Sequence, residues 1–210
     1  MIPEHAVTFF TNIQKALSRL VLVSELETEP IDLVCGLDVS YRGEEGVAAA
    51  VVWSLRSRAI LETSLYTGEV LFPYLPGLLY LREAPLMLTA LKRLKSPPEL
   101  LLVDGHGLAH PRRAGLASLV GLLADTPSIG VAKSLLYGEV VADGGVDYVL
   151  VGGERVGLVY RYKAGRRLYL SIGHKTDLKT LRVLLDRLGD DLLQPLMHAH
   201  RESRRAAKAG

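Results

Sequence analysis

Apolar side chains recur every three or four residues at the start of the chain, at Val7, Phe10, Ile13, Leu17 and Leu20. This spacing predicts an amphipathic helix over residues 4–23. Three stretches typical of β-strands follow, at residues 31–41, 46–55 and 58–70. The connectors between them are short and contain glycine or charged residues, which is typical of hairpins. The first third of the chain therefore predicts one helix and an antiparallel meander of three strands.

Strand and helix alternate in the rest of the chain. A helical pattern over 77–95 contains Pro85, which predicts either a kink near Leu81 or a second helical segment that begins at the proline. The further strands are predicted at 99–105, 127–134, 146–152, 155–162 and 166–173, and the further helices at 112–125, 178–188 and 195–208. This order predicts an α/β fold with a mixed central β-sheet flanked by helices, which is the ribonuclease H-like arrangement.

The composition is that of an ordinary globular chain. Of the 210 residues, 49% are hydrophobic and 23% are charged, and no Ser/Gly/Pro-rich linker separates two hydrophobic blocks. We therefore expect a single domain over residues 1–210. The sole cysteine, Cys35, lies in an apolar run, which fits a reducing compartment. Because neither a signal peptide nor a stretch long enough to span a membrane is recognisable, we expect a cytoplasmic monomer without membrane contact.

Charge is close to balanced overall but uneven along the chain. The net charge is +2, and residues 201–210 alone carry four basic groups against one acidic group. This basic tail is expected either to be disordered or to add non-specific affinity for DNA. Residues 155–179 hold seven lysines or arginines and one acid. Such a stretch either binds phosphates on one face or forms the solvated edges of strands, and the sequence leaves both open.

Three carboxylates occupy positions where apolar side chains are expected. Asp38 interrupts a strand pattern, Asp104 ends the run LLLV before a glycine-rich turn, and Glu83 shares a helical stripe with leucines. A buried carboxylate needs a partner, and a cation would supply one. The alternatives are that Asp38 pairs with a buried arginine or lysine, that Asp104 caps a turn, and that Pro85 shifts Glu83 into solvent.

Convergence of these three acids would create a site for Mg²⁺ or Mn²⁺, which prefer oxygen ligands. Zinc is not indicated, because the six histidines show no HExxH spacing and CxxC pairs are absent. A carboxylate-bound Mg²⁺ favours phosphodiester hydrolysis as the chemistry. The sequence also lacks a GxSxG elbow, a P-loop and a GxGxxG turn, which argues against other hydrolases, NTPases and dinucleotide enzymes.

Three other side chains are candidates for substrate contacts. Lys133 ends the apolar strand PSIGVAKS and could neutralise a phosphate, unless its charge simply extends into solvent. His110 in GLAHPRR could transfer a proton, although a loop histidine is more often structural. Tyr74 in the rigid segment PYLPG could replace an extruded base, with Leu75 and Pro76 beside it, and a packed turn tyrosine is the alternative.

Five segments resemble one nuclease family, namely GLDVSY, PYLPGLLYLREAP, DGHGLAHPRRAGLAS, IGVAKSLL and SIGHK. In order and spacing they are similar to endonuclease V, which acts at inosine, the product of adenine deamination. The resemblance extends from about residue 5 to about residue 205. It implies a ribonuclease H-like domain in which Asp38 and Asp104 bind Mg²⁺ or Mn²⁺. Glu83 would complete the site directly or through water.

The resemblance also implies roles for residues outside the acids. Lys133 and His110 would lie at the scissile phosphate, and Tyr74, next to Pro76, would act as the wedge. The positions matching the hypoxanthine pocket are Gly77, Leu79 and Gly105, where a tight fit would exclude the exocyclic amine of guanine. His200 is a fourth site residue in a segment that departs from the family pattern, because Met197 replaces an arginine.

The implied reaction is hydrolysis of the second phosphodiester bond 3′ to deoxyinosine in DNA, which leaves the lesion in place with 3′-hydroxyl and 5′-phosphate ends. Two alternatives remain at this stage. Some relatives act chiefly on inosine in RNA, and the motifs do not separate the two substrates. A non-catalytic nucleic-acid binder with the same fold is the other alternative, against which the intact Asp38, Glu83, Asp104 and Lys133 argue.

Overall fold

The computed structural model describes residues 2–28 and 31–209, and the strands in these ranges form one nine-stranded sheet in the order β3-β2-β1-β4-β5-β9-β8-β7-β6. The strands are β1 Leu33–Arg42, β2 Glu45–Ser54, β3 Ala59–Glu69, β4 Leu100–Asp104, β5 Ser128–Ala132, β6 Glu139–Asp143, β7 Val146–Val151, β8 Glu154–Tyr162 and β9 Arg166–Ile172. The helices are α1 Glu4–Ser18, α2 Leu79–Lys92, α3 Leu116–Ala124, α4 Leu178–Leu188 and α5 Gln194–Ala209, with short 3-10 turns at Lys163–Gly165 and Gly189–Leu193.

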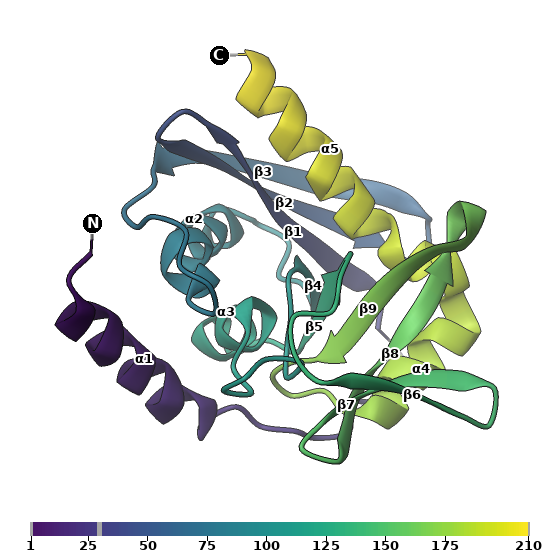
Figure 1. Ribbon diagram of the computed structural model, residues 1–210. Helices are drawn as coiled ribbons and strands as arrows, with labels where there is room; N and C mark the ends of the chain where they lie inside the picture. Colours follow the sequence, from purple (N-terminus) through teal and green to yellow (C-terminus); the bar gives the residue numbers. More distant parts are fainter. Residues whose placement is uncertain (1, 29–30, 210) are drawn as a thin grey trace.

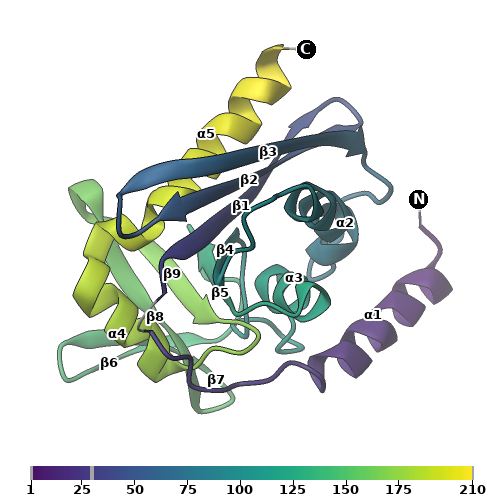
Figure 2. The same cartoon turned by 180° about the vertical axis from the view of Figure 1, so that it is seen from behind.

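The sheet is mixed, as the alternating pattern predicts. Strands β1, β4 and β5 run parallel to one another, and every other neighbouring pair is antiparallel. Helices cover both faces: α5 crosses β1 and β2 on one face, while α2 and α3 pack on the other (Figures 1 and 2). Because β1 and β2 are covered on both faces, their apolar runs are buried almost continuously.

Helix α5 begins against the backbone of β1 at Gly36. A Cβ atom at this position would lie 2.2 Å from the carbonyl group of Pro195, so only glycine allows this approach. Helix α5 then continues along β1 past Asp38. The contact therefore fixes the position of α5 next to the strand that carries the first acid.

The structure differs from the predicted elements most clearly at the end of α1 and at β6. Helix α1 ends at Ser18 instead of residue 23, because the backbone N–H of Leu22 donates to His174 and that of Leu26 donates to Thr180. The chain there is held extended by partners that are distant in sequence. Strand β6 was not predicted, because it is short and mostly exposed and lacks the apolar alternation of a core strand.

The basic tail after residue 200 is helical, because α5 continues to Ala209. The helix expected at 195–208 is therefore present, and the disordered alternative for residues 201–209 is not what the structure shows. Within the described residues, no helix has the length and apolar character needed to cross a membrane.

Candidate metal centre and base pocket

Asp38 and Asp104 lie side by side on neighbouring parallel strands. Asp38 is in β1, and Asp104 is the last residue of β4. The register pairs Leu37 with Val103, so each aspartate is the next residue along its own strand. Carboxyl ends of parallel strands form the edge where α/β folds place their chemistry. The structure thus brings together the two acids that the sequence singled out.

Helix α5 adds a histidine to these two acids. The Nδ1 atom of His200 lies 3.3 Å from Oδ2 of Asp38. Asp38, Asp104 and His200 each offer one ligand atom, and these atoms all lie within 4.8 Å of one another. The two carboxylates are the oxygen donors that Mg²⁺ and Mn²⁺ prefer, and the imidazole adds one softer nitrogen donor. His200 therefore reaches the acidic site even though its sequence segment departs from the family pattern.

The electrostatics of this group favour a bound cation. Burial, followed by the neighbouring charge of Asp104, raises the pKa of Asp38 from its ordinary value near 3.8 to about 8, although the hydroxyl of Ser203 works in the opposite direction. Burial lowers the pKa of His200, and the nearby Lys133 adds to this effect. Two adjacent and largely buried carboxylates repel each other when both are ionised. A bound divalent cation would offset this repulsion. The donor set fits such a metal.

Lys133 supplies a single positive charge at the same edge. It follows β5, and its Nζ atom lies 3.1 Å from Oδ2 of Asp104. The Lys133 side chain is 64% exposed, so the ion pair is open to solvent. An exposed lysine can leave such a partner at little cost, because surface ion pairs contribute little free energy.

Glu83 reaches the site from the opposite face of the sheet. Successive side chains of a strand point to opposite faces, and Asp38 meets α5 while Tyr41 meets α2. The Tyr41 hydroxyl donates to Oε1 of Glu83 over 2.6 Å. Burial raises the pKa of Glu83 to about 7, against the opposing effect of the Tyr41 hydrogen bond. Glu83 is buried as predicted, but it is not part of the three-residue group around Asp38.

A pocket of about 470 Å³ adjoins these acids. Its wall includes most of the predicted site residues, namely Asp38, Glu83, Asp104, Lys133, His110, Tyr74, Gly77, Leu79 and Gly105. Pro76 is exposed and His200 is half-buried, and neither belongs to this wall. Tyr74 is 63% exposed at the rim. Asp38 and Asp104 therefore share one cavity with the predicted base pocket, whereas His200 lies outside its wall.

The carbonyl oxygen of Gly77 in the wedge loop, residues 73–77, accepts two hydrogen bonds. Nη2 of Arg112 donates over 2.6 Å, and Nε2 of His110 donates over 3.0 Å. The Nδ1 atom of His110 accepts from the Arg112 backbone, which assigns the proton to Nε2. Gln14 of α1 in turn accepts from Arg112 and donates to Ala114. This network fixes the wedge loop against the turn that follows Asp104.

His110 is thus engaged at both ring nitrogens. Burial, followed by the positive charge of Arg112, lowers the pKa of His110 to about 4, so the ring is neutral at pH 7. A proton-transfer role at the scissile phosphate would have to break the two hydrogen bonds that His110 makes here. The observed geometry instead makes His110 part of the pocket wall.

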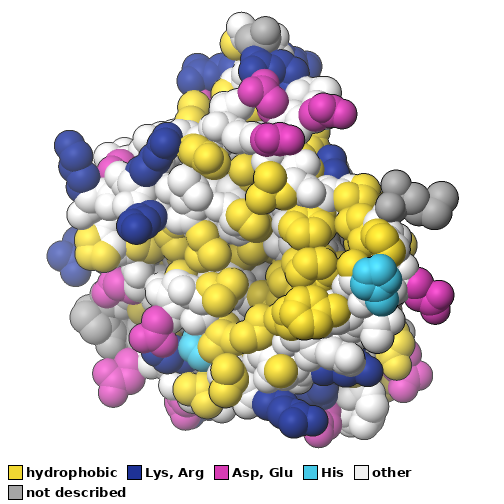
Figure 3. All heavy atoms as spheres, turned by 90° about the vertical axis from the view of Figure 1, so that its left-hand side faces the viewer, with side chains coloured by type: hydrophobic (Ala, Val, Ile, Leu, Met, Phe, Trp, Pro, Cys, Tyr) yellow, Lys and Arg dark blue, Asp and Glu magenta, His cyan; other side chains and the backbone are white. Residues whose placement is uncertain are grey.

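A second chain of contacts joins the wedge loop to Glu83. The Cζ atom of Arg82 lies 4.3 Å from the centre of the Tyr41 ring. Nη1 of Arg82 also donates to the carbonyl oxygen of Phe72, just before the wedge loop. Phe72 packs edge-on against Phe10 of α1. Figure 3 shows the side of the molecule with α1 and this loop, where hydrophobic side chains gather. The wedge loop is therefore supported from both α1 and α2.

The basic stretch 155–179 does not form one free cationic face. Four of its seven lysines and arginines pair with carboxylates: Arg155 with Asp143, Arg167 with Asp147, Lys175 with Asp125, and Lys179 with Glu25. Lys163 and Arg166 lie over the ring of Tyr162. The alternative of solvated strand edges describes most of this stretch.

Several contacts of the site were given no role by the sequence analysis. Ser203, Tyr41, Arg112 and Gln14 hold the predicted residues, and of these only Tyr41 and Arg112 lie in segments that resemble the family, GLDVSY and DGHGLAHPRRAGLAS. Tyr41 follows Asp38 by three residues in a strand, so it points to the other face, where α2 could not be foreseen. Ser203 follows His200 by three residues in α5, and that spacing places both on one helix face. This spacing is the one available clue.

Comparison with known proteins identifies the family. A family model described as Endonuclease V matches residues 15–201. Endonuclease V of Saccharolobus solfataricus is 43% identical over 179 residues, covering 85% of this chain and 86% of the relative. The crystal structure of endonuclease V from Streptomyces avermitilis has a TM-score of 0.86 at 34% identity, covering 100% of this chain and 95% of that one.

A further solved structure carries a nucleic acid. Ciona intestinalis endonuclease V, in complex with a 23mer DNA containing an inosine followed by a ribo-adenosine, has a TM-score of 0.87 at 26% identity and covers 99% of both chains. The fold is therefore ribonuclease H-like, as the order of elements predicts. On the family model and these relatives, the chain is an endonuclease that belongs to the endonuclease V family.

Proposed function

We propose that this protein is a divalent-metal-dependent DNA repair endonuclease that nicks DNA at the second phosphodiester bond 3′ to deoxyinosine. The nick leaves the lesion in place, with 3′-hydroxyl and 5′-phosphate ends. The observation that carries the proposal is the joint cavity, in which Asp38, Asp104 and Tyr74 border one pocket of about 470 Å³. Such a cavity can hold an extruded base while the strand beyond it reaches the acids.

Asp38, Asp104 and His200 would hold Mg²⁺ or Mn²⁺, and Glu83 would contribute from the α2 side directly or through water. When bound, the cation activates water and neutralises the charge that develops on the phosphate. Lys133 is suited to contact the scissile phosphate, because its exposed side chain can exchange the carboxylate of Asp104 for a phosphate oxygen. The Asp104 carboxylate would then be released for the cation.

The pocket would recognise hypoxanthine by backbone groups. The carbonyl of Gly77 is already occupied by Arg112 and His110, so this oxygen is not free to accept from a base. Helix α2 begins after Leu78, and no side chain caps its first N–H groups. The residues that carry these groups, Leu79 and Tyr80, line the pocket, so their backbone N–H groups would be the donors to the base. A donor fits the O6 carbonyl of hypoxanthine and disfavours the amino group of adenine at the same position.

Guanine shares the O6 carbonyl and differs from hypoxanthine by its exocyclic amine. The pocket wall contains Gly77 and Gly105 with positive φ angles, so backbone stands where side chains would otherwise be. A close backbone wall would exclude the exocyclic amine of guanine by its size. The N–H groups of this amine would also lose their hydrogen bonds to water, which would further weaken the binding of guanine. Tyr74 at the rim would fill the space that the extruded base leaves in the stack.

The test is cleavage of matched labelled duplexes, one with deoxyinosine in DNA and one with inosine in RNA. Each duplex is incubated with Mg²⁺, with EDTA, and with the Asp38→Ala variant, and a guanosine duplex serves as the specificity control. Nicking 3′ to deoxyinosine that requires both Mg²⁺ and Asp38 would support the proposal. Equal cleavage of the guanosine duplex would contradict the proposed pocket.

The RNA arm tests the second candidate function, an inosine-specific endoribonuclease. The ribo-adenosine that follows inosine in the Ciona intestinalis complex is a reason to test this candidate, since it places a 2′-hydroxyl next to the lesion. Cleavage confined to the RNA duplex would favour this candidate. Binding of either duplex without cleavage under any condition would favour the non-catalytic binder.

A further inference from the structure

Ser203 of α5 lies directly behind the Asp38 carboxylate. Its side chain is fully buried, and its hydroxyl donates to Oδ2 of Asp38 over 2.5 Å. The Ser203 oxygen is also 2.8 Å from the hydroxyl oxygen of Ser40 and 3.1 Å from the carbonyl oxygen of His200. Ser203 therefore contacts both β1 and its own helix at the acidic site.

The direction of these hydrogen bonds follows from the donor count. A serine hydroxyl carries one proton, and an ionised carboxylate is a stronger acceptor than a backbone carbonyl. When Asp38 is ionised, the proton of Ser203 points to Asp38, and Ser40 donates its own proton to the oxygen of Ser203. The result is a chain of two hydrogen bonds, in which Ser40 donates to Ser203 and Ser203 donates to Asp38.

We propose that Ser203 is a positioning residue of the metal site, which fixes the orientation of the Asp38 carboxylate toward the cation. This inference rests on the proposed function, because it assumes that Asp38 binds a metal ion. The hydroxyl sits on the α5 side of Asp38, three residues after His200, so one helix face both supplies a candidate ligand and orients another. Partners behind metal-binding carboxylates contribute strongly to metal affinity.

A purely structural role for Ser203 is the competing explanation, and the chain offers a matched control for it. Ser118 of α3 is also a fully buried serine, but its hydroxyl oxygen has no hydrogen-bond partner within the described structure. Both Ser203→Ala and Ser118→Ala remove one buried oxygen from a helix. Only Ser203→Ala removes a hydrogen bond to a candidate metal ligand.

The experiment measures Mn²⁺ binding to the free protein by electron paramagnetic resonance, in the absence of nucleic acid. We expect Ser203→Ala to weaken Mn²⁺ binding by about 10- to 100-fold. Ser118→Ala should bind Mn²⁺ as tightly as the wild-type protein. Ser40→Ala should give a smaller loss, because Ser203 can still donate to Asp38. Melting curves of all variants show whether each is folded.

Unchanged Mn²⁺ affinity in a folded Ser203→Ala variant would overturn the inference, and so would an equal loss in Ser118→Ala. If Ser203→Ala does not fold, Ser203→Cys takes its place, since a thiol keeps the shape but is a weak donor. The same weakening of Mn²⁺ binding is expected of it. If the wild-type protein binds no Mn²⁺ and nicks no duplex, the proposed function itself fails. Wild-type binding and nicking with an unaffected Ser203→Ala variant would remove the role of Ser203 alone.

Discussion

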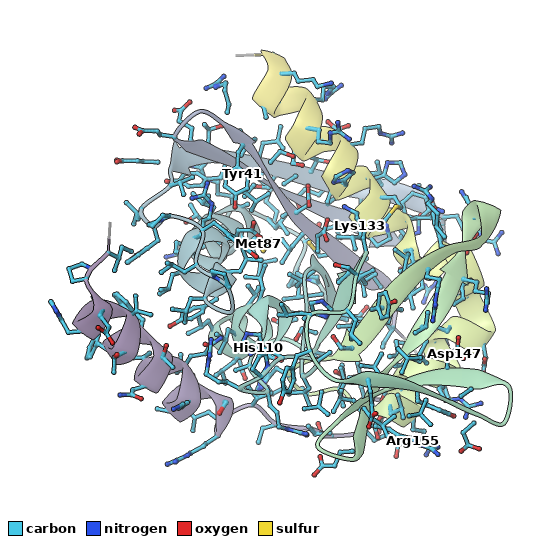
Figure 4. The ribbon with its side chains drawn as sticks, in the orientation of Figure 1. Tyr41, Met87, His110, Lys133, Asp147 and Arg155 are labelled. Atoms are coloured by element: carbon cyan, nitrogen blue, oxygen red, sulfur yellow. The ribbon has the colours of Figure 1, made fainter. Side chains whose placement is uncertain are left out.

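The centre of the sheet and its β6–β9 end use charged side chains in opposite ways. At the centre, Asp38 and Asp104 are adjacent and like-charged, and Asp38 is buried. At the β6–β9 end, Arg155 pairs with Asp143 and Arg167 with Asp147, and all four side chains are at least partly exposed. Figure 4 shows Tyr41, Lys133 and His110 around the middle of the molecule, and Asp147 and Arg155 beside β7 and β8.

This difference shows which charges indicate function. Exposed opposite charges pair at almost no gain in stability, so they can be replaced freely. Buried like charges raise the free energy of the folded chain, and they persist where a ligand compensates them. The dense run of lysines and arginines was the more conspicuous sequence feature. The isolated acids inside apolar strands were the more informative one.

The largest expected effect comes from neutralising an acid at the centre. Asp104→Asn removes a candidate metal ligand and several kcal/mol of charge stabilisation in the transition state. We expect kcat/KM on a deoxyinosine duplex to fall by roughly 10³-fold or more, because each 1.36 kcal/mol corresponds to a tenfold change. Asp143→Asn at the β6–β9 end is the control and should leave kcat/KM within about twofold. Comparable losses in the two variants would break the comparison.

Arg112, which holds the wedge loop beside the central acids, should contribute more to cleavage than the paired arginines of the β6–β9 end. Arg112→Met removes the hydrogen bond from Nη2 to the Gly77 carbonyl and the one from Nε to Gln14. A charged hydrogen bond contributes about 1.5–3 kcal/mol, so we expect kcat/KM to fall by about 10- to 100-fold. Binding of Mn²⁺ to the free protein should not change, since the acids are untouched. A loss of Mn²⁺ binding would show that Arg112 supports the metal site instead of the wedge loop.

The buried acids also predict how stability depends on pH without metal. Asp38 has a folded pKa raised to about 8, so the folded state holds its proton more tightly than the unfolded state. The stability from this group is complete below the unfolded pKa near 3.9 and is lost as the pH rises through 8. Glu83, raised to about 7, acts in the same direction at lower pH.

We therefore expect the melting temperature in EDTA to fall between pH 7 and pH 9, by about 2–4 °C for each kcal/mol lost. Asp38→Asn should flatten this slope. We choose a pH range above 6.5 because the pKa of His110 is lowered to about 4 in the folded protein. Below pH 6.5 this histidine makes stability increase with pH, which would mask the decrease caused by Asp38 and Glu83. Scanning calorimetry in EDTA provides the measurement, and an identical slope in Asp38→Asn would assign the effect to other groups.

The smallest effect concerns phosphate contacts at the β6–β9 end. Arg161 is exposed on β8, whereas Arg155 on the same strand pairs with Asp143. If Arg161 contacts a DNA phosphate, Arg161→Gln should reduce the slope of log Kobs against log salt by about 1. Arg155→Gln should leave the slope unchanged. Equal slopes for both variants and the wild type would show that Arg161 contacts no phosphate.

The sequence predicted what depends on periodicity, and it missed what depends on tertiary contacts. Asp38 was detected because it interrupts an apolar run, Asp104 because it ends one before a glycine-rich turn, and Glu83 because it lies on an apolar helical stripe. The support of these acids by Tyr41 and Ser203 was not predicted, because it depends on which helix covers which face of β1. Strand β6 was missed for a related reason: its exposed side chains show no core pattern, although Gly144 and Gly145 after it are typical of a hairpin turn.

The position of α5 in the chain has a consequence for how the protein is made. Asp38, Glu83 and Asp104 precede residue 105, whereas His200 and Ser203 are synthesised about a hundred residues later. A chain emerging from the ribosome tends to fold from its N-terminal part first. The acids of a nascent chain are therefore present long before the helix that completes their surroundings. If His200 and Ser203 act as proposed, the metal site is complete only once α5 has been synthesised, and we expect chains that lack α5 to bind the cation more weakly.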